Sequence, residues 1–334
     1  MDIEFHYHMT YLIAARAGYS PKEASTIAHA SQLVDDNQQE WEISGAPDGT
    51  PYTSMYSQSI NAFRIVDPDR ERKLFPVYMA FHFIPGDPER VTAWREDGRM
   101  HLLNTTPNGL LARMLMKRAL QTGNLHRIGV ASHAYADTWA HQNFTGHYDS
   151  FNALNVDTPL SIGHAMAGRD PDPPGHTWTD PRLVGHLKEV DNTERCLQAA
   201  RHLFHLYRLA QPQDRREKDQ GAALAGLEKH LRQAIGSPAD GPEAVERRKE
   251  RYGVRATRKH YRAHPMPEYS PEAWFEEAVE KTAGGKRDWK DPAAYRETDW
   301  FQFQEAVKKH FALAWSLFSA ALEDRMDLKL PAVP

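Results

Sequence analysis

The segment from 124 to 144, NLHRIGVASHAYADTWAHQNF, constrains the fold more than any other part of the chain. It contains no proline and a single glycine, so it is expected to be helical. His133, Asp137 and His141 are spaced i, i+4 and i+8 within it. At about 100° per residue these positions drift by only about 40° per step, so all three project from one helical face. His126 falls on roughly the same face.

Ligand-type side chains on a helix otherwise rich in Ala, Val, Tyr and Trp would be costly to bury without partners. A bound cation resolves this conflict, because Zn²⁺, Mn²⁺ and Fe²⁺ accept imidazole and carboxylate ligands. A surface or hydrogen-bonded histidine cluster is the alternative. The chain has 18 His and a single cysteine, Cys196, so a disulfide framework and a cysteine-based zinc site are excluded. The spacing therefore favours a metal site built from His, Asp and Glu.

The rest of the sequence predicts an all-α protein, a bundle of many helices. With 334 residues, 40% of them hydrophobic, the chain can bury a substantial core. Ser20-Pro21-Lys22-Glu23 is a capping box with proline at the first helical position, which marks a helix start. Residues 44–72 and 145–182 are expected to be loops, and no segment alternates as a strand does. Helices are expected over residues 6–17, 20–36, 106–123, 124–144, 190–210, 224–235, 243–252, 271–282 and 300–325.

We expect residues 1–210 to form a metal-binding helical core, 211–270 a polar insertion or extension, and 271–334 C-terminal helices that pack on the core. The run Glu246–Arg251 is expected to be a solvated helix face. The net charge of −4 gives no nucleic-acid signature. The N-terminus lacks the features of a signal peptide, and no apolar run approaches ~18 residues, so a cytoplasmic protein is expected.

The central segment resembles the ligand helix of the zinc-dependent phospholipase C/P1 nuclease superfamily. Its form, His133-x3-Asp137-x3-His141-Gln-Asn-Phe144, is closest to the branch that includes the fungal heterokaryon-incompatibility C proteins, where the pattern is roughly HxxxDxxAHxN[FY]. In the secreted phospholipases and P1-type nucleases, five residues including a proline separate the aspartate from the second histidine. The stretches EFHYHMTYLIAARAG, ASQLVDDN and GHAMAG also resemble a family of bacterial proteins that brings no known activity.

The resemblance implies a helical fold of the phospholipase C/P1 nuclease type that holds two or three divalent metals, zinc first, with iron or manganese as alternatives. His8 and Asp36 are fallbacks for the first two ligands. The residues that match the superfamily's order of ligands are His6, Asp35, His82, His133, Asp137, His141 and His164.

Two positions depart from the superfamily pattern. An acidic ligand expected one turn after His164 falls on Gly168, so this acid is either missing or supplied by Asp170 or Asp172. His176 with Asp180 is a competing pair. The secreted enzymes also use the amine and carbonyl of an N-terminal tryptophan. This chain begins with Met1, so Asp2 or Glu4 could substitute, or the site could hold fewer than three metals.

The resemblance further implies a hydrolase that acts on a phosphodiester or phosphomonoester of unknown class. A water activated by the metal would be the nucleophile, and Asp35 or Asp36 would be the general base. Two different functions remain open on the same ligands, a non-catalytic interaction protein stabilised by metal and a dinuclear iron oxygenase. The chain contains no His-Asp dipeptide of the HD phosphohydrolases, no P-loop and no GxSxG elbow.

Overall fold

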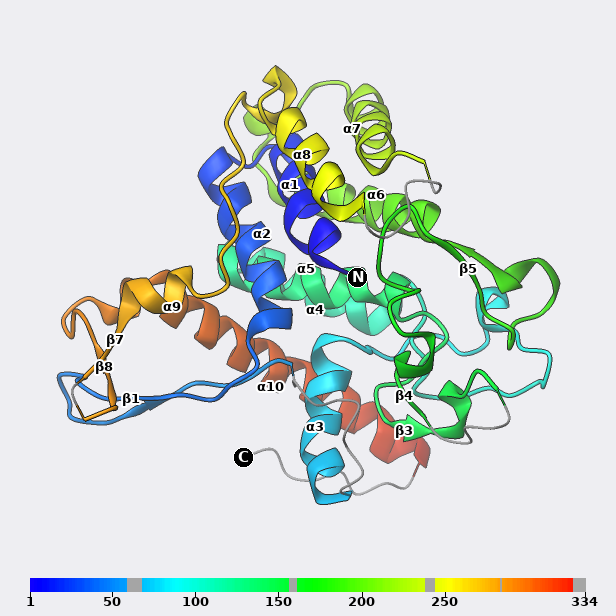
Figure 1. Ribbon diagram of the computed structural model, residues 1–334, viewed down its shortest axis with the longest axis horizontal. Helices are drawn as coiled ribbons and strands as arrows, with labels where there is room; N and C mark the ends of the chain where they lie inside the picture. The colour runs from blue at the N-terminus through cyan, green and yellow to red at the C-terminus, as the bar shows by residue number, and fades with distance from the viewer. Residues whose placement is uncertain (59–67, 156–160, 238–243, 283, 327–334) are drawn as a thin grey trace.

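The computed structural model describes residues 1–58, 68–155, 161–237, 244–282 and 284–326 (Figure 1). The described part is mostly helical, which confirms the expected all-α class in this coarse form. A π-helical turn, Glu4–Met9, leads into the first helix. The α-helices are α1 (Thr10–Ala17), α2 (Pro21–Asp36), α3 (Pro68–Phe81), α4 (Leu110–Gln121), α5 (Leu125–Ala140), α6 (Asn192–Ala210), α7 (Gln220–Ile235), α8 (Val245–Ala256), α9 (Ala273–Ala278) and α10 (Asp299–Met326).

The connections between the helices contain short antiparallel strand pairs, so the expectation that the chain has no strands was wrong. Each strand has two or three residues, which is too short for an alternating pattern to be visible in sequence. The pairs are β1 (Glu42–Ile43) with β2 (Tyr52–Thr53), β3 (Tyr148–Asp149) with β4 (Ser161–Ile162), β5 (Thr177–Thr179) with β6 (Glu189–Asp191), and β7 (Val279–Lys281) with β8 (Arg287–Trp289).

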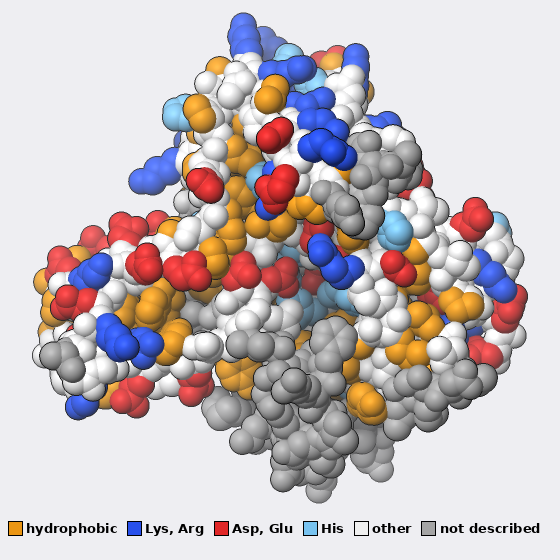
Figure 2. Space-filling view, viewed as in Figure 1, with side chains coloured by type: hydrophobic (Ala, Val, Ile, Leu, Met, Phe, Trp, Pro, Cys, Tyr) orange, Lys and Arg blue, Asp and Glu red, His pale blue; other side chains and the backbone are white. Residues whose placement is uncertain are grey.

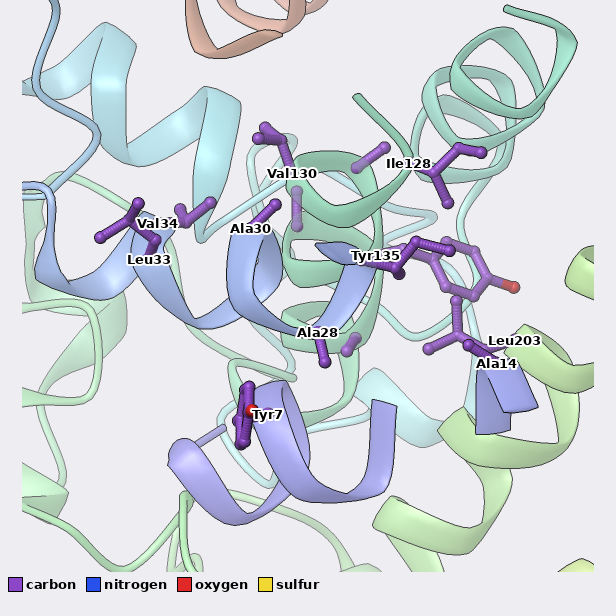
Figure 3. Close-up of a cluster of buried hydrophobic side chains, with 14 of the residues drawn as sticks. Tyr7, Ala14, Ala28, Ala30, Leu33, Val34, Ile128, Val130, Tyr135 and Leu203 are labelled. Atoms are coloured by element: carbon purple, nitrogen blue, oxygen red, sulfur yellow. The ribbon is translucent and has the colours of Figure 1, made fainter. Parts of the chain in front are cut away.

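Helix α5 lies at the centre of the molecule and contacts α2, α3, α4, α6 and α10 (Figure 1). Its crossing with α2 is close because Gly129 has no side chain. A Cβ there would lie 2.5 Å from the carbonyl oxygen of Ile27 and 2.6 Å from the Cβ of Ala30. Figure 3 shows Ala30 of α2 at this crossing, whereas Ala28 points to the other side of α2. This packing fixes the relative position of the two helices that carry Asp35, His133 and Asp137.

Several predicted element boundaries were right and others were wrong. The capping box forms as expected, with the Ser20 hydroxyl accepting from the Glu23 amide at 3.3 Å and the Glu23 carboxylate accepting from the Ser20 amide at 2.7 Å. Helix α5 does not run to Phe144 but ends at Ala140, and His141 is its C-terminal cap with φ −90° and ψ 15°. The predicted loop 44–72 contains the β1–β2 connection, β2 and the first turn of α3, while 59–67 lie outside the described residues.

Two further boundaries differ in the helices before and after α5. The helix expected from residue 106 begins at Leu110, after Gly109 in extended conformation. The helix expected over 271–282 ends at Ala278, because Val279–Lys281 pair with Arg287–Trp289 as strand β7. Residues 156–160 of the predicted loop 145–182 also lie outside the described residues, as do 327–334 at the C-terminus.

The C-terminal third packs on the helices that precede it. Arg248 of α8 is 2% exposed, and its guanidinium binds the buried carboxylate of Glu4 at 2.7 Å. The expectation that Glu246–Arg251 is a fully solvated face was therefore wrong at its central arginine. Helix α10 lies against α3, α4, α5 and α9. Within the described ranges, no helix is both long and apolar enough to cross a membrane.

Candidate metal centre

Asp137 of α5 is the hub of a buried cluster of predicted ligands. Its Oδ1 lies 3.1 Å from Nε2 of His6, which comes from the π-helical turn before α1. Its Oδ2 lies 3.2 Å from Nδ1 of His82, just past the end of α3, and 3.2 Å from Nε2 of His133, one turn earlier on α5. One carboxylate therefore faces three imidazoles from three separate elements.

Asp35, near the C-terminal end of α2, completes this cluster. Its Oδ1 lies 3.7 Å from Nε2 of His133 and 3.9 Å from Nδ1 of His82, and its Oδ2 lies 4.0 Å from Nε2 of His6. These distances exceed hydrogen-bond lengths but suit two atoms that share an ion at about 2.0–2.2 Å. The cluster thus contains two overlapping ligand groups, His6 with His133 and Asp137, and Asp35 with His82 and His133.

A third ligand group joins the end of α5 to the following long connection. His164 and His141 have ring centroids 4.9 Å apart, and their Nε2 atoms lie 3.8 and 4.0 Å from Oδ1 of Asp172. The structure therefore brings Asp172, which the sequence could not distinguish from Asp170, next to the predicted histidines. Asp170 instead lies 3.1 Å from His176.

Four further residues with ligand-type side chains lie away from these groups. His8 contacts the sulfur of Met266, and Asp180 forms an ion pair with Arg182. The carboxylate of Glu4 is occupied by its ion pair with the buried Arg248. His126 binds Asp299 at 2.8 Å, because a position about 10 Å further back along the same face of α5 cannot reach the cluster.

The N-terminal residues lie beside the hub. The amino group of Met1 lies 2.5 Å from Oδ1 of Asp137 and 3.5 Å from Oδ1 of Asp172. Asp2 lines the same cavity, but its Oδ1 accepts a hydrogen bond from the backbone amide of Glu4.

Backbone carbonyls orient the histidines of the centre. Nδ1 of His133 lies 2.9 Å from the carbonyl oxygen of Ser31, and Nδ1 of His141 lies 2.7 Å from that of His82. Nδ1 of His164 lies 2.9 Å from the carbonyl oxygen of Gly168. A carbonyl only accepts, so each Nδ1 carries the proton and each Nε2 presents a lone pair to the cluster.

In His82 the two ring nitrogens have exchanged roles, and one of them again presents a lone pair to the cluster. Its Nε2 lies 3.0 Å from the carbonyl oxygen of Ser57, so its Nδ1 is the nitrogen that presents a lone pair to Asp35 and Asp137. His6 is buried, and within the described part of the chain neither of its ring nitrogens makes a hydrogen bond of good geometry, although Nε2 lies 3.1 Å from Oδ1 of Asp137. Unpartnered buried nitrogens are costly, and a bound cation would remove that cost.

The electrostatics of the centre favour neutral forms of His6, His133 and His141 and an ionised Asp137. At His82 burial opposes the charged form, but the neighbouring carboxylate of Asp137 raises the pKa above its usual value. Burial lowers the pKa of His6 to about 4, and burial also lowers the pKa values of His133 and His141. Burial opposes ionisation of Asp137, but the neighbouring imidazoles, with His141 first, and the Met1 ammonium hold its pKa well below its usual value. Burial raises the pKa of Asp35 to about 6. Neutral imidazole and carboxylate are the forms that bind metals.

The centre opens to solvent through a cavity of about 520 Å³, lined by Asp35, His82, Asp137, His141 and Asp172 among others. Figure 2 shows acidic and histidine side chains meeting in this hollow at the middle of the visible face. One side of the ligand groups is therefore buried in helices, and the other is accessible to a small molecule.

Comparison with known proteins finds a family that spans nearly the whole chain. A family model matches residues 1–317, which is nearly the whole chain and includes every residue of the centre. No curated protein and no solved structure matches this chain. The chain belongs to the family described as a family of unknown function (DUF6765).

Proposed function

We propose that this protein is a metal-dependent phosphoester hydrolase whose centre holds two or three divalent cations, zinc first. The observation that carries this proposal is the shared orientation of four histidines. Each has one ring nitrogen bonded to a backbone carbonyl and the other directed at the carboxylates of the centre. The ligands would be His6, Asp35, His82, His133, Asp137, His141, His164 and Asp172.

The charge balance supports a phosphoester as the substrate. Three carboxylates, Asp35, Asp137 and Asp172, do not neutralise two divalent cations, so a net positive charge remains for an anionic substrate. When bound, the cations would supply a nucleophile from water near neutral pH and neutralise phosphoryl oxygens. The cavity of about 520 Å³ suits a small phosphoester or one residue of a larger one.

Asp36 is our candidate for the general base. It is exposed and lines the cavity, but it belongs to none of the three ligand groups. Its Oδ2 accepts hydrogen bonds from the Tyr269 hydroxyl at 2.6 Å and from Nε2 of Gln32 at 3.1 Å. Both bonds use one oxygen, so Oδ1 remains available to accept a proton from a water in the cavity.

The acid missing at Gly168 is the feature that favours a non-catalytic metal protein. Asp172 lies beside His141 and His164 and would fill that role. An acid at this position supports the hydrolase over the non-catalytic protein.

The test is metal content by mass spectrometry on protein purified without chelators or a histidine tag, together with zinc-dependent hydrolysis of bis(p-nitrophenyl) phosphate and p-nitrophenyl phosphate. We expect two or three equivalents of zinc in the wild type. Asp137→Asn removes the hub and should lower both metal content and kcat/KM, the latter by more than about 10³-fold. Asp36→Asn should keep the metal and lower kcat by about 10²–10⁴-fold.

The exposed His186 offers a matched control, because its replacement by alanine removes a histidine outside the ligand groups of the described chain. His186→Ala should keep both metal and activity, and circular dichroism should show that each variant is folded. Full metal content in folded Asp137→Asn would contradict the proposal. Stoichiometric iron in a coloured protein would favour the dinuclear oxygenase instead.

A further inference from the structure

A second group of ligand-type side chains lies outside the metal centre and shares no residue with it. His101, His147 and Asp149 each offer an atom within 4.8 Å of the other two. Nε2 of His101 lies 3.7 Å and Nε2 of His147 lies 3.6 Å from Oδ2 of Asp149. The three side chains are 19%, 23% and 27% exposed, so an ion could reach them from solvent.

The separations suit an ion better than a hydrogen-bonded triad. Both nitrogen–oxygen distances exceed hydrogen-bond lengths. Two ligand atoms that share a tetrahedral ion at about 2.0–2.1 Å are separated by about 3.3 Å, so only small movements would be needed. The rings of His101 and His147 are neighbours, with centroids 5.3 Å apart.

The two loops that carry these residues are already paired. The backbone amide of Thr105 donates to the carbonyl oxygen of Phe144 at 2.9 Å. His101 lies four residues before one end of this bond, and His147 lies three residues after the other. The group is therefore held together before any ion binds, which lowers the entropic cost of binding.

Local hydrogen bonds also direct the ligand atoms. Oδ1 of Asp149 accepts from the backbone amide of Phe151 at 2.6 Å, which leaves Oδ2 to face the two rings. Nδ1 of His147 lies 3.1 Å from the hydroxyl of Thr145, which leaves its Nε2 on the side of Asp149. Such outer contacts orient metal ligands in known sites.

From this geometry we propose that His101, His147 and Asp149 bind one divalent transition-metal ion, zinc in the first instance, at an accessory site. The bound ion would link the loop before α4, which carries His101, to the loop after α5, which carries His147 and Asp149. Imidazole and carboxylate are ligands that zinc accepts, and three protein ligands leave a position for water. The inference does not depend on the proposed hydrolase activity, because it uses none of the residues of the centre.

Two neighbours make this site weaker than the centre. The backbone amide of Leu103 donates to Nδ1 of His101 at 3.1 Å, so this hydrogen bond must open when Nε2 binds a cation. The guanidinium of Arg99 lies 3.7 Å from Oδ1 of Asp149 and competes with the cation for its charge. Zinc at the accessory site should therefore exchange readily.

The experiment is a titration of the metal-free full-length protein with Zn²⁺, followed by calorimetry and by metal content after dialysis. We expect the wild type to bind one zinc equivalent more weakly than those of the centre. His147→Ala and Asp149→Asn should each lose this weak equivalent and keep the tight ones. Arg99→Ala should tighten the weak site several-fold, because it removes a competing cation while leaving all three ligands.

The variant pairs separate this inference from the proposed function. Asp137→Asn should lose tightly bound zinc from the centre and keep the weak equivalent, which is the reverse of His147→Ala. In Asp149→Asn the side-chain oxygen can still accept the hydrogen bond from the Phe151 amide, so the local turn should be kept. This variant therefore still tests the site if His147→Ala does not fold. A weak equivalent that persists in both His147→Ala and Asp149→Asn would overturn the accessory site, as would a wild type that binds zinc only at the centre.

Discussion

The metal centre has two halves that rest on different scaffolds. The helical half consists of His6, Asp35, His82, His133 and Asp137, and the loop half consists of His141, His164 and Asp172. In the helical half every side chain except that of Asp35 is at most 3% exposed. In the loop half the exposed fractions are 7%, 18% and 19%.

The two halves should therefore differ in how they bind metal. The helical half is held by the crossing of α2 and α5, so its ligands keep their geometry without an ion and bind with little ordering cost. In the loop half, His164 and Asp172 lie on the connection between α5 and α6, outside the α-helices of the described residues, so no helix fixes their positions. We expect the helical half to bind first and more tightly.

Asp172→Asn tests whether the two halves bind metal separately, and it should have the largest effect on metal affinity of the variants that compare them. The substitution removes the carboxylate of the loop half and should weaken its metal by more than about 100-fold, because loss of an outer partner alone costs about 10–100-fold. The helical half should keep its metal, so the protein should lose one equivalent. Metal content after dialysis measures this directly.

Asp170→Asn is a matched control two residues away, since Asp170 pairs with His176 rather than with the centre. It should keep every equivalent. If Asp172→Asn instead released all of the metal, the two halves would form one cooperative unit and the comparison would fail.

Helical periodicity, which relates residue number to direction, predicted His133 and Asp137 of the helical half. His6, Asp35 and His82 were expected only from the resemblance to the phospholipase C/P1 nuclease superfamily. The i, i+4, i+8 spacing correctly placed His133, Asp137 and His141 on one side of α5. Periodicity fixes direction but not position along the axis. His126 shares that face, yet it lies about 10 Å further back and binds Asp299 instead.

The loop half was predictable only in part because no period governs a loop. The sequence could not choose between Asp170 and Asp172, and only the folded path of the turn directs one to His176 and the other to His141. The accessory ligands His101, His147 and Asp149 were missed for the same reason. Their only sequence signal is the His147-x-Asp149 spacing, which is too common to be specific.

Gly129→Ala probes the scaffold of the helical half. The added Cβ would lie 2.5 Å from the carbonyl oxygen of Ile27, so α2 and α5 would have to move apart. Such overpacking should lower the free energy of unfolding by about 1–3 kcal/mol, measured by urea denaturation of the metal-free protein. Gly253→Ala is the control, because a Cβ there meets no atom of the described chain within 4 Å. Equal stability of wild type and Gly129→Ala would show that the crossing is not tightly fixed.

His310→Gln asks whether buried histidines on the helical side set the acid stability of the protein. His310 of α10 is 5% exposed, its Nε2 donates to the carbonyl oxygen of Ala80 at 3.0 Å, and burial lowers its pKa to about 4. Between about pH 6.5 and 4 the unfolded chain binds a proton here and the folded protein does not, so stability falls as the pH falls. In the metal-free wild type, this histidine should lower the free energy of unfolding by about 1–2 kcal/mol between about pH 7 and 5. His310→Gln should remove that decrease. As a control, His186→Gln replaces an exposed histidine and should leave the pH dependence of the free energy of unfolding unchanged. If His310→Gln and the wild type show the same pH dependence, His310 does not set the acid stability.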